Sequence, residues 1–144
     1  MKRLFQFNTL PAEQKKLDEL TVLLVGNNPI EMSAVHAHLQ TLKDKIAFIY
    51  ISFNDKEVLK LIKQNKPNYV LIDDNYGTSS MRRLLGQLNK IKGHAYALTL
   101  LKTKNSAESV FGFQDYLMKD SLNPERLYFS IKNALKNKQR LLIG

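Results

Sequence analysis

The sequence lacks the features that mark several specialised classes of protein. It has no cysteine, which excludes disulfides, thiolate metal sites and cysteine nucleophiles together. No apolar run approaches the roughly 20 residues that a membrane-spanning helix needs. The basic start, Met1-Lys2-Arg3, is followed by Gln6 and Pro11, so no continuous apolar region of a signal peptide follows it. These absences predict a cytoplasmic protein that does not contact a membrane.

Signatures of enzymes are also missing. An enzyme or a nucleotide-binding domain would need a first loop rich in glycine or hydroxyl residues, and GNNP at 26–29 is poor in both. No serine lies in a nucleophile elbow, and Ser79-Ser80 is better explained as a helix cap. We therefore expect a binding module and not an enzyme. The length of 144 residues suits one domain with a real core.

The positive charge is concentrated in the last part of the chain. Residues 1–20 carry four basic and three acidic side chains, and residues 21–80 carry six of each. Residues 81–144 carry twelve basic and four acidic side chains, which accounts for +8 of the net charge of +9. The simplest interpretation is a solvated helix face, because charge informs about solubility and association more than about fold. An acidic partner, either protein or nucleic acid, is the alternative.

Apolar segments of strand length alternate with segments of helical periodicity. Strands are predicted at 21–25, 46–51, 69–73, 95–100 and 113–118. Helices are predicted between and after them, with N-caps at Asn28, Asn54, Ser79 or Ser80, and Asn123. The first helix would bury Ile30, Ala34, Val35, Leu39 and Leu42, and the fourth, at 106–111, would be short. This alternation predicts an α/β fold, a doubly wound parallel sheet with helices on both faces.

The central strand, 69–73, is a continuous apolar run that ends at two carboxylates, Asp73 and Asp74. Parallel strands place their carboxyl ends along one edge, where open α/β sheets bind ligands. That edge would gather Asp73, Thr99 and Lys119. A carboxylate nucleophile, a hydroxyl donor and an ammonium counter-charge together suit the handling of a phosphoryl group.

Three segments resemble the receiver domain of two-component response regulators. VLLVGNNP at 22–29 looks like the first strand and the loop that follows it, and KPNYVLID at 66–73 looks like the strand of the phosphoacceptor. The most specific segment is DYLMKD at 115–120 followed by NPERL at 123–127, which looks like the fifth strand and the start of the last helix. The resemblance covers residues 21–139 and implies the flavodoxin-like strand order 2-1-3-4-5.

The resemblance also implies roles for four residues. Asp73 would accept a phosphoryl group, Thr99 would be the switch hydroxyl, Tyr116 the switch aromatic, and Lys119 the lysine at the acyl phosphate. The face made by the fourth helix, the fifth strand and the fifth helix would bind a protein partner. That partner would be a histidine kinase, an output domain or another signalling protein, and a homodimer is also possible.

The chain departs from this family at the metal site. The acidic pair that holds Mg²⁺ after the first strand falls at Gly26 and Asn27, which leaves Asp73 and conceivably Asp74 as the carboxylates. Because Mg²⁺ is usually held through one or two carboxylates, we expect weak binding or none, with Asp73 as the ligand if it binds. Two interpretations follow: a slow receiver that is still phosphorylated, or a pseudo-receiver in which the Asp73–Lys119 pair is structural.

The resemblance leaves both ends of the chain outside the expected domain. Residues 1–20 form an N-terminal extension in which Pro11 could open a short helix, and residues 140–144 could begin a linker to an output domain. The leading hypothesis is an atypical receiver that signals by protein contact. The alternative is a nucleic-acid-binding regulator that uses the basic C-terminal half.

Overall fold

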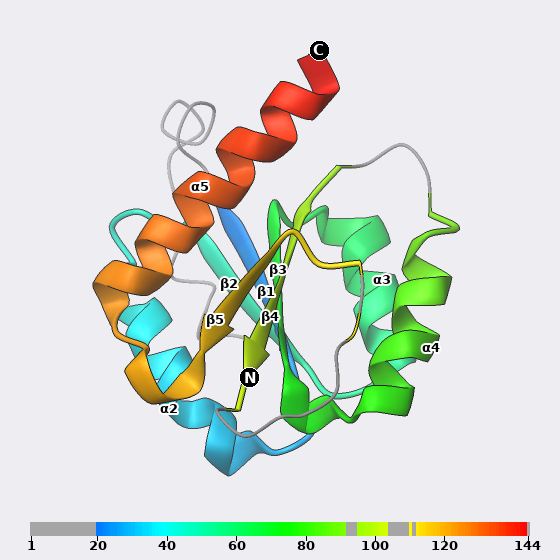
Figure 1. Cartoon of the computed structure of the whole chain (residues 1–144), viewed down its shortest axis with the longest axis horizontal. Helices are drawn as coiled ribbons and strands as arrows, with labels where there is room; N and C mark the ends of the chain where they lie inside the picture. Colours follow the sequence, from blue (N-terminus) through cyan, green and yellow to red (C-terminus); the bar gives the residue numbers. More distant parts are fainter. Residues whose placement is uncertain (1–19, 92–94, 104–109, 111, 144) are drawn as a thin grey trace.

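One five-stranded parallel sheet lies between two layers of helices (Figure 1). In this computed structural model the residues that are described are 20–91, 95–103, 110 and 112–143. The strand order is β2-β1-β3-β4-β5, and all four neighbouring pairs are parallel. Helices α2 and α5 cover one face, and α3 and α4 cover the other (Figure 1). The predicted fold class and strand order are confirmed.

The elements follow the alternation that the sequence predicts. The strands are β1 Thr21–Val25, β2 Phe48–Ser52, β3 Tyr69–Asp73, β4 Ala97–Lys102 and β5 Asp115–Met118. The helices are α2 Pro29–Gln40, α3 Asp55–Asn65, α4 Thr78–Leu88 and α5 Pro124–Ile143. Two short 3₁₀ turns, η2 Asp74–Tyr76 and η3 Lys119–Ser121, follow β3 and β5 directly.

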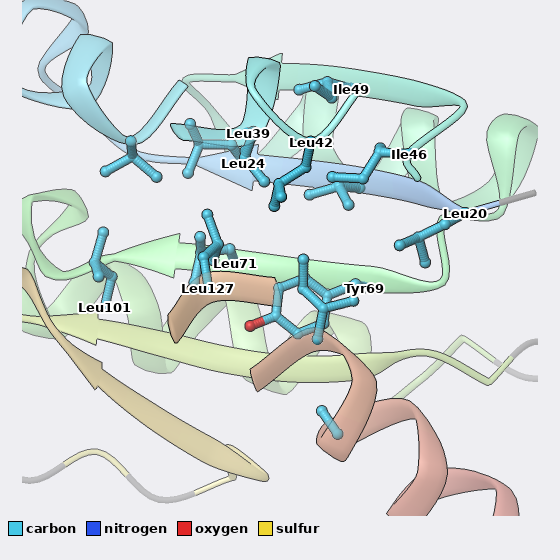
Figure 2. Packing of buried hydrophobic residues seen from close by; sticks show 14 of the residues in the cluster. Leu20, Leu24, Leu39, Leu42, Ile46, Ile49, Tyr69, Leu71, Leu101 and Leu127 are labelled. Carbon is cyan, nitrogen blue, oxygen red and sulfur yellow. The ribbon is translucent and has the colours of Figure 1, made fainter. Parts of the chain in front are cut away.

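Two apolar layers hold the helices against the sheet. Successive residues of a strand point to opposite faces, so Leu24 and Leu71 join the cluster under α2 and α5, whereas Leu23 and Val70 join the cluster under α3 and α4. Figure 2 shows the first cluster, in which Leu127 of α5 packs on the sheet. Every residue of β1 and β3 is buried. Burial on both faces explains why these strands are continuous apolar runs.

Asparagine side chains fix the starts of three helices. Oδ1 of Asn28 accepts hydrogen bonds from the backbone N–H groups of Ile30 (3.1 Å) and Glu31 (3.2 Å). Asn54 caps α3 through the N–H of Glu57 at 2.8 Å. Asn123 accepts from the N–H of Arg126, also at 2.8 Å, at the start of α5. Each cap satisfies donors that have no partner within the helix, and the predicted caps are confirmed.

The predicted serine cap of α4 is wrong. The residue that precedes α4 is Gly77, which makes no side-chain cap bond, and Ser79 and Ser80 lie inside the first turn. Gly77 has φ +100, a conformation that a residue with a Cβ rarely adopts. The turn η2 ends at Tyr76, and Gly77 alone separates it from the first residue of α4. The backbone geometry after β3 therefore sets the helix start.

The predicted apolar face of α2 is wrong at Ile30 and Ala34. Ile30 is 86% exposed and Ala34 is also exposed, whereas Met32 is 2% exposed. Met32, Val35 and Leu39 are spaced at i, i+3 and i+7, so they form the stripe that faces the sheet. The exposed Ile30 lies outside this stripe.

Three strands begin two residues later than predicted: β2 at Phe48, β4 at Ala97 and β5 at Asp115. The apolar residues before them pack on the core without joining the ladder. Ile46 is 3% exposed, and Tyr96 and Phe113 pack partly buried against the core. Apolar periodicity indicates which residues are buried and not which residues form the hydrogen bonds of a strand. This explains why the three strands begin later than predicted.

Two predicted helices, one near the N-terminus and the shortened fourth one, lie outside the described residues. These are the short helix from Pro11 and the shortened helix at 106–111.

Leu20 is 9% exposed, and its carbonyl accepts from the N–H of Ala47 at 2.8 Å, so the packed domain includes it. Helix α5 runs past residue 139 to Ile143 without a break. Within the described ranges, none of the helices combines the length and the apolar character needed to cross a bilayer.

We predict opposite effects for alanine at two glycines. Gly86 is exposed inside α4, and a Cβ there would have no heavy atom within 4 Å. Gly86→Ala should raise the free energy of unfolding by about 0.5–1 kcal/mol. Gly26 is buried, and a Cβ there would lie 2.3 Å from Sδ of Met32 and 2.8 Å from Oδ1 of Asn75. Gly26→Ala should lower the free energy of unfolding by about 1–3 kcal/mol. Urea denaturation checks both, and equal effects would contradict the packing at Gly26.

Candidate functional site

Asp73 ends β3 and is fully buried, at 0% exposure. Its Oδ1 accepts the backbone N–H of Asn75 at 3.0 Å and lies 2.5 Å from Nζ of Lys119. Its Oδ2 has no hydrogen-bond partner among the described residues. A buried carboxylate needs a compensating charge, and here Lys119 provides it.

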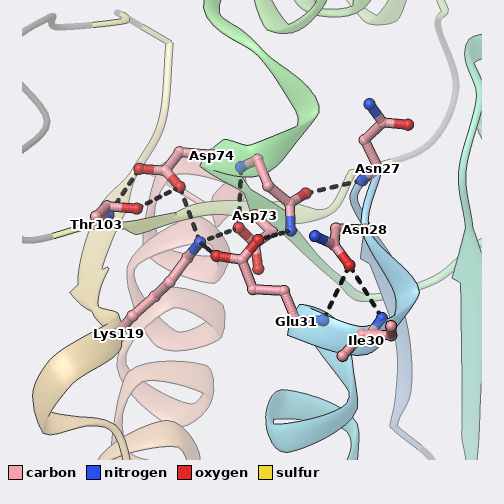
Figure 3. A network of polar contacts seen from close by, with 9 residues as sticks. Asn27, Asn28, Ile30, Glu31, Asp73, Asp74, Thr103 and Lys119 are labelled. Atoms are coloured by element: carbon pink, nitrogen blue, oxygen red, sulfur yellow. Dashed lines mark hydrogen bonds and ion pairs between the residues drawn. The ribbon is translucent and has the colours of Figure 1, made fainter.

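Lys119 is the centre of the site. It follows β5 directly, and its Nζ lies within ion-pair distance of three carboxylates (Figure 3): Asp73 at 2.5 Å, Asp74 at 3.0 Å and Glu31 at 3.1 Å. The side chain of Lys119 is 17% exposed. An ammonium group has three N–H donors, so three acceptors can use all of them. We call Glu31, Asp73, Asp74 and Lys119 the acid–lysine cluster.

Asn75 connects this cluster to the loop after β1. Its Nδ2 donates to Oε1 of Glu31 at 3.0 Å, and its Oδ1 accepts the backbone N–H of Asn27 at 2.8 Å. Its own backbone N–H donates to Asp73. The amide of Asn75 therefore links α2, the β1 loop and the end of β3.

Asp74 connects the end of β4 to the cluster through hydrogen bonds to Thr103. Its Oδ2 accepts the backbone N–H of Thr103 at 2.6 Å, and its Oδ1 accepts the Thr103 hydroxyl at 2.9 Å. Asp74 also reaches Lys119, so the same carboxylate joins the ends of β3, β4 and β5. The predicted convergence of strand ends is present, with Thr103 as the hydroxyl residue.

The surroundings shift the pKa values of the cluster. Burial raises the pKa of Asp73, and the Lys119 ammonium opposes this rise. Burial acts to lower the pKa of Lys119, but its hydrogen bonds to Asp73 and Asp74 outweigh this, so its pKa lies above the usual range. The hydrogen bonds from Asn75 and Lys119 lower the pKa of Glu31. Lys119 is therefore charged at neutral pH.

Thr99 is not brought to this site. The residue of β4 that pairs with Asp73 is Leu101, whereas Thr99 pairs with Leu71, which places it about 7 Å earlier along the strand. Thr99 is fully buried beside the hydroxyl of Tyr69, whose pKa burial raises to about 12. The later start of β4 explains the difference, because the strand continues to Lys102 and its end carries Thr103.

Tyr116 lies on β5 and is 45% exposed. Its hydroxyl donates to the carbonyl of Val110 at 3.3 Å, and Nζ of Lys102 lies 5.6 Å from the centre of its ring. Its ring also contacts that of Phe113, with 6.2 Å between centroids. The side chain therefore lies on the outer surface of the edge strand and does not take part in the acid–lysine cluster.

Gly26 and Asn27, the positions at which the acidic pair of the resembled family falls, contribute no ligand to the cluster. Gly26 has no side chain and, as its neighbours show, no room for one. The side chain of Asn27 points away from Asp73 and Lys119 (Figure 3). Among the described residues, no group of three or more His, Cys, Asp or Glu side chains is arranged to hold a metal ion. The three carboxylates that remain are already paired with the Lys119 ammonium, so the site fits Mg²⁺ poorly.

Sequence reasoning missed three members of the site: Glu31, Asn75 and Thr103. Glu31 lies in the first turn of α2 after the Asn28 cap, where an acidic residue is common for local reasons alone. Asn75 carried a usable signal, because it lies two residues after an aspartate that accepts its N–H, as in an Asx turn. No sequence signal marked Thr103 as a member of the site, since its position depends on where β4 ends.

We predict that the cluster is more sensitive to loss of its cation than to loss of one acid. Lys119→Met would leave three neighbouring carboxylates without a counter-charge and should lower the free energy of unfolding by about 3 kcal/mol. Asp73→Asn should cost less, because it removes a buried charge and leaves Lys119 paired with Asp74 and Glu31. Urea denaturation measures both. The exposed Lys90→Met is the control and should change stability by about 0.5 kcal/mol or less. A larger loss for Asp73→Asn would contradict this arrangement.

Comparison with solved structures identifies the fold, whereas comparison with family models and curated proteins gives no match. Among solved structures, the chain is similar to a signal receiver domain from Vibrio parahaemolyticus, with a TM-score of 0.67, 22% identity, and coverage of 88% of this chain and 98% of that one.

Two further structures show the same similarity. A response regulator from Desulfuromonas acetoxidans has a TM-score of 0.65 and 22% identity, over 81% of this chain and 97% of that one. A CheY-like response regulator receiver domain from Methylobacillus flagellatus has a TM-score of 0.61 and 15% identity, over 80% and 98%. The chain therefore has the flavodoxin-like fold of response-regulator receiver domains.

Proposed function

We propose that this chain is an atypical receiver module of two-component-type signal transduction. It acts by binding a protein partner, with phosphorylation at Asp73 weak or absent. The observation that carries this proposal is the position of Lys119, whose ammonium is bound by three carboxylates while Asp73 is fully buried. In this arrangement the Asp73–Lys119 pair holds the strand ends together without a phosphoryl group.

Access to Asp73 argues against efficient phosphorylation. An oxygen of Asp73 would have to approach the phosphorus of the donor to within roughly 3–3.5 Å. The side chain has no exposed surface, and Oδ1 already accepts from Asn75 and Lys119. Only the free Oδ2 could attack, and it is buried. A donor would therefore reach Asp73 only if the cluster opened.

The electrostatics of the cluster argue in the same direction. In phosphoryl transfer a divalent metal neutralises charge on the transferring group. Here all three carboxylates that could bind a metal already lie within ion-pair distance of Lys119, and Gly26 supplies no further ligand. Mg²⁺ would have to displace the ammonium from Asp73. We therefore propose that the domain binds Mg²⁺ weakly or not at all.

The surface of β5 and α5 supports a protein contact. Tyr116 and Met118 of β5 are 45% and 38% exposed, and Phe129 of α5 is 68% exposed. A groove of about 450 Å³ lies between these elements and is lined by Asp115, Tyr116, Leu117, Glu125, Arg126, Phe129, Ser130 and Asn133. Exposed aromatic residues beside polar ones are typical of protein interfaces. We call this surface the β5–α5 face and propose it as the docking surface for a kinase, an output domain or another signalling protein.

We predict that acetyl phosphate leaves the protein largely unmodified. Intact mass spectrometry after incubation with excess donor should show little or no adduct, with or without Mg²⁺, because Asp73 is enclosed. Asp73→Asn is the control for modification at other sites. A stoichiometric, Mg²⁺-dependent adduct that the control lacks would overturn the proposal of weak or absent phosphorylation and favour a working receiver.

We predict that a partner contacts Phe129 and not Ile30. Both side chains are large, apolar and exposed, but Ile30 lies at the start of α2, outside the β5–α5 face. A photo-reactive amino acid at residue 129, introduced in the source cells, should cross-link to a kinase or an output-domain protein, and excess unlabelled domain should compete. The same group at residue 30 is the matched control. Equal cross-linking at both positions would contradict docking on this face.

A further inference from the structure

A second concave site lies beside the acid–lysine cluster. It is a pocket of about 570 Å³ lined by Asn27, Phe53, Asn54, Asp55, Lys56, Tyr76, Ser80 and Arg83. These residues come from the segments that follow β1, β2 and β3, at the carboxyl edge of the sheet. The order of the strands reverses between β1 and β3, which is where doubly wound sheets bind ligands. The volume lies within the range of small-molecule sites.

We propose that this pocket binds a small ligand with a planar ring and an anionic group, of the nucleoside monophosphate class. The net positive charge of the residues that line the pocket favours binding of an anion. Asp55 is its one carboxylate, and it is already paired: Nε of Arg83 lies 2.7 Å from its Oδ2, and the Tyr76 hydroxyl donates to its Oδ1. Lys56 adds a second positive charge, so the pocket carries a net charge of +1.

Arg83 retains hydrogen-bonding capacity for such a ligand. Its bond to Asp55 uses Nε, and a guanidinium has five N–H donors in all. Its side chain is 56% exposed, so the remaining donors are accessible to a molecule in the pocket. Phosphate is a suitable partner because its oxygens match the geometry of a guanidinium.

The other lining residues suit a base and a sugar. Phe53 is 40% exposed and offers an aromatic surface on which a planar ring can stack. Asn27, Asn54 and Ser80 supply neutral donors and acceptors of the kind that sugar hydroxyls use. Oδ1 of Asn54 is used in the α3 cap, which leaves its Nδ2 as a donor. These contacts come from side chains and not from a glycine-rich loop, so the sequence carried no motif for them.

The turn η2 joins the pocket to the acid–lysine cluster. Asp74 enters the cluster and Tyr76 lines the pocket, while Asn75 between them binds both Glu31 and the backbone of Asn27. A ligand that changes the position of this turn would therefore change the cluster as well. The binding proposal itself does not depend on the proposed signalling function.

Titration of the isotope-labelled chain by NMR with 5′-AMP tests the proposal. Amide signals of residues 53–56 and 76–83 should shift in a saturable manner. Adenosine, which lacks the phosphate, and ribose 5-phosphate, which lacks the ring, should each bind at least about tenfold more weakly. Phe53→Ala and Lys56→Gln should each weaken AMP binding by about tenfold. Lys60→Gln removes an exposed charge one turn along α3, outside the pocket, and should leave the affinity unchanged.

Three outcomes would overturn the proposal. The first is the absence of saturable shifts around the pocket at millimolar AMP. The second is an equal effect of Lys56→Gln and Lys60→Gln, which would indicate diffuse attraction to a basic protein. The third is ribose 5-phosphate binding as tightly as AMP, which would indicate a simple anion site. None of these depends on whether Asp73 accepts a phosphoryl group, so the acetyl phosphate experiment tests a separate proposal.

Discussion

The ammonium group of Lys119 holds together elements that are far apart in the sequence. It contacts Glu31 at the start of α2 and Asp73 and Asp74 at the end of β3, and it is itself carried by the residue that follows β5. A parallel sheet places its strand ends side by side but leaves them as separate loops. Here one largely enclosed cation, whose side chain is 17% exposed, joins them. The acid–lysine cluster depends on the ion pairs that its carboxylates make with Lys119, because a buried carboxylate without a counter-charge would cost several kcal/mol.

This constraint explains how Asp73 and Lys119 can pair without an acidic side chain in the loop after β1, where Gly26 and Asn27 lie. In this chain Glu31 and Asp74 join Asp73 around Lys119, so three anions share one internal cation, with a hydrogen bond from Asn75 to Glu31 and two from Thr103 to Asp74. The glycine at position 26 fits this arrangement, because Met32 and Asn75 fill the space that a side chain there would need. Tyr76 of the same turn, η2, lines the neighbouring pocket, which places a candidate ligand site next to the acid–lysine cluster.

Residue types and their order were enough to predict the fold. Alternating apolar segments indicated five strands and the helices between them, and Asn28, Asn54 and Asn123 marked three helix starts because capping depends only on neighbouring backbone groups. Asp73 and Lys119 could also be placed at one edge, because each directly follows or ends an apolar run. The serine cap of α4 and the inward position of Ile30 were wrong, since the first depends on the backbone at Gly77 and the second on which side of α2 faces the sheet.

The sequence by itself therefore determined the sheet, its helical layers and the meeting of Asp73 with Lys119. The tertiary structure alone decided which further groups complete the site. Thr99 and Thr103 are both threonines in or next to β4, so residue type does not distinguish them. The register of β4 against β3 does, because it pairs Asp73 with Leu101 and so brings Thr103 to the site. Glu31 and Asn75 are 44 positions apart, and a hydrogen bond at that separation leaves no local pattern. Local rules predict interactions within a few residues, whereas contacts between loops depend on the register and packing of the whole sheet.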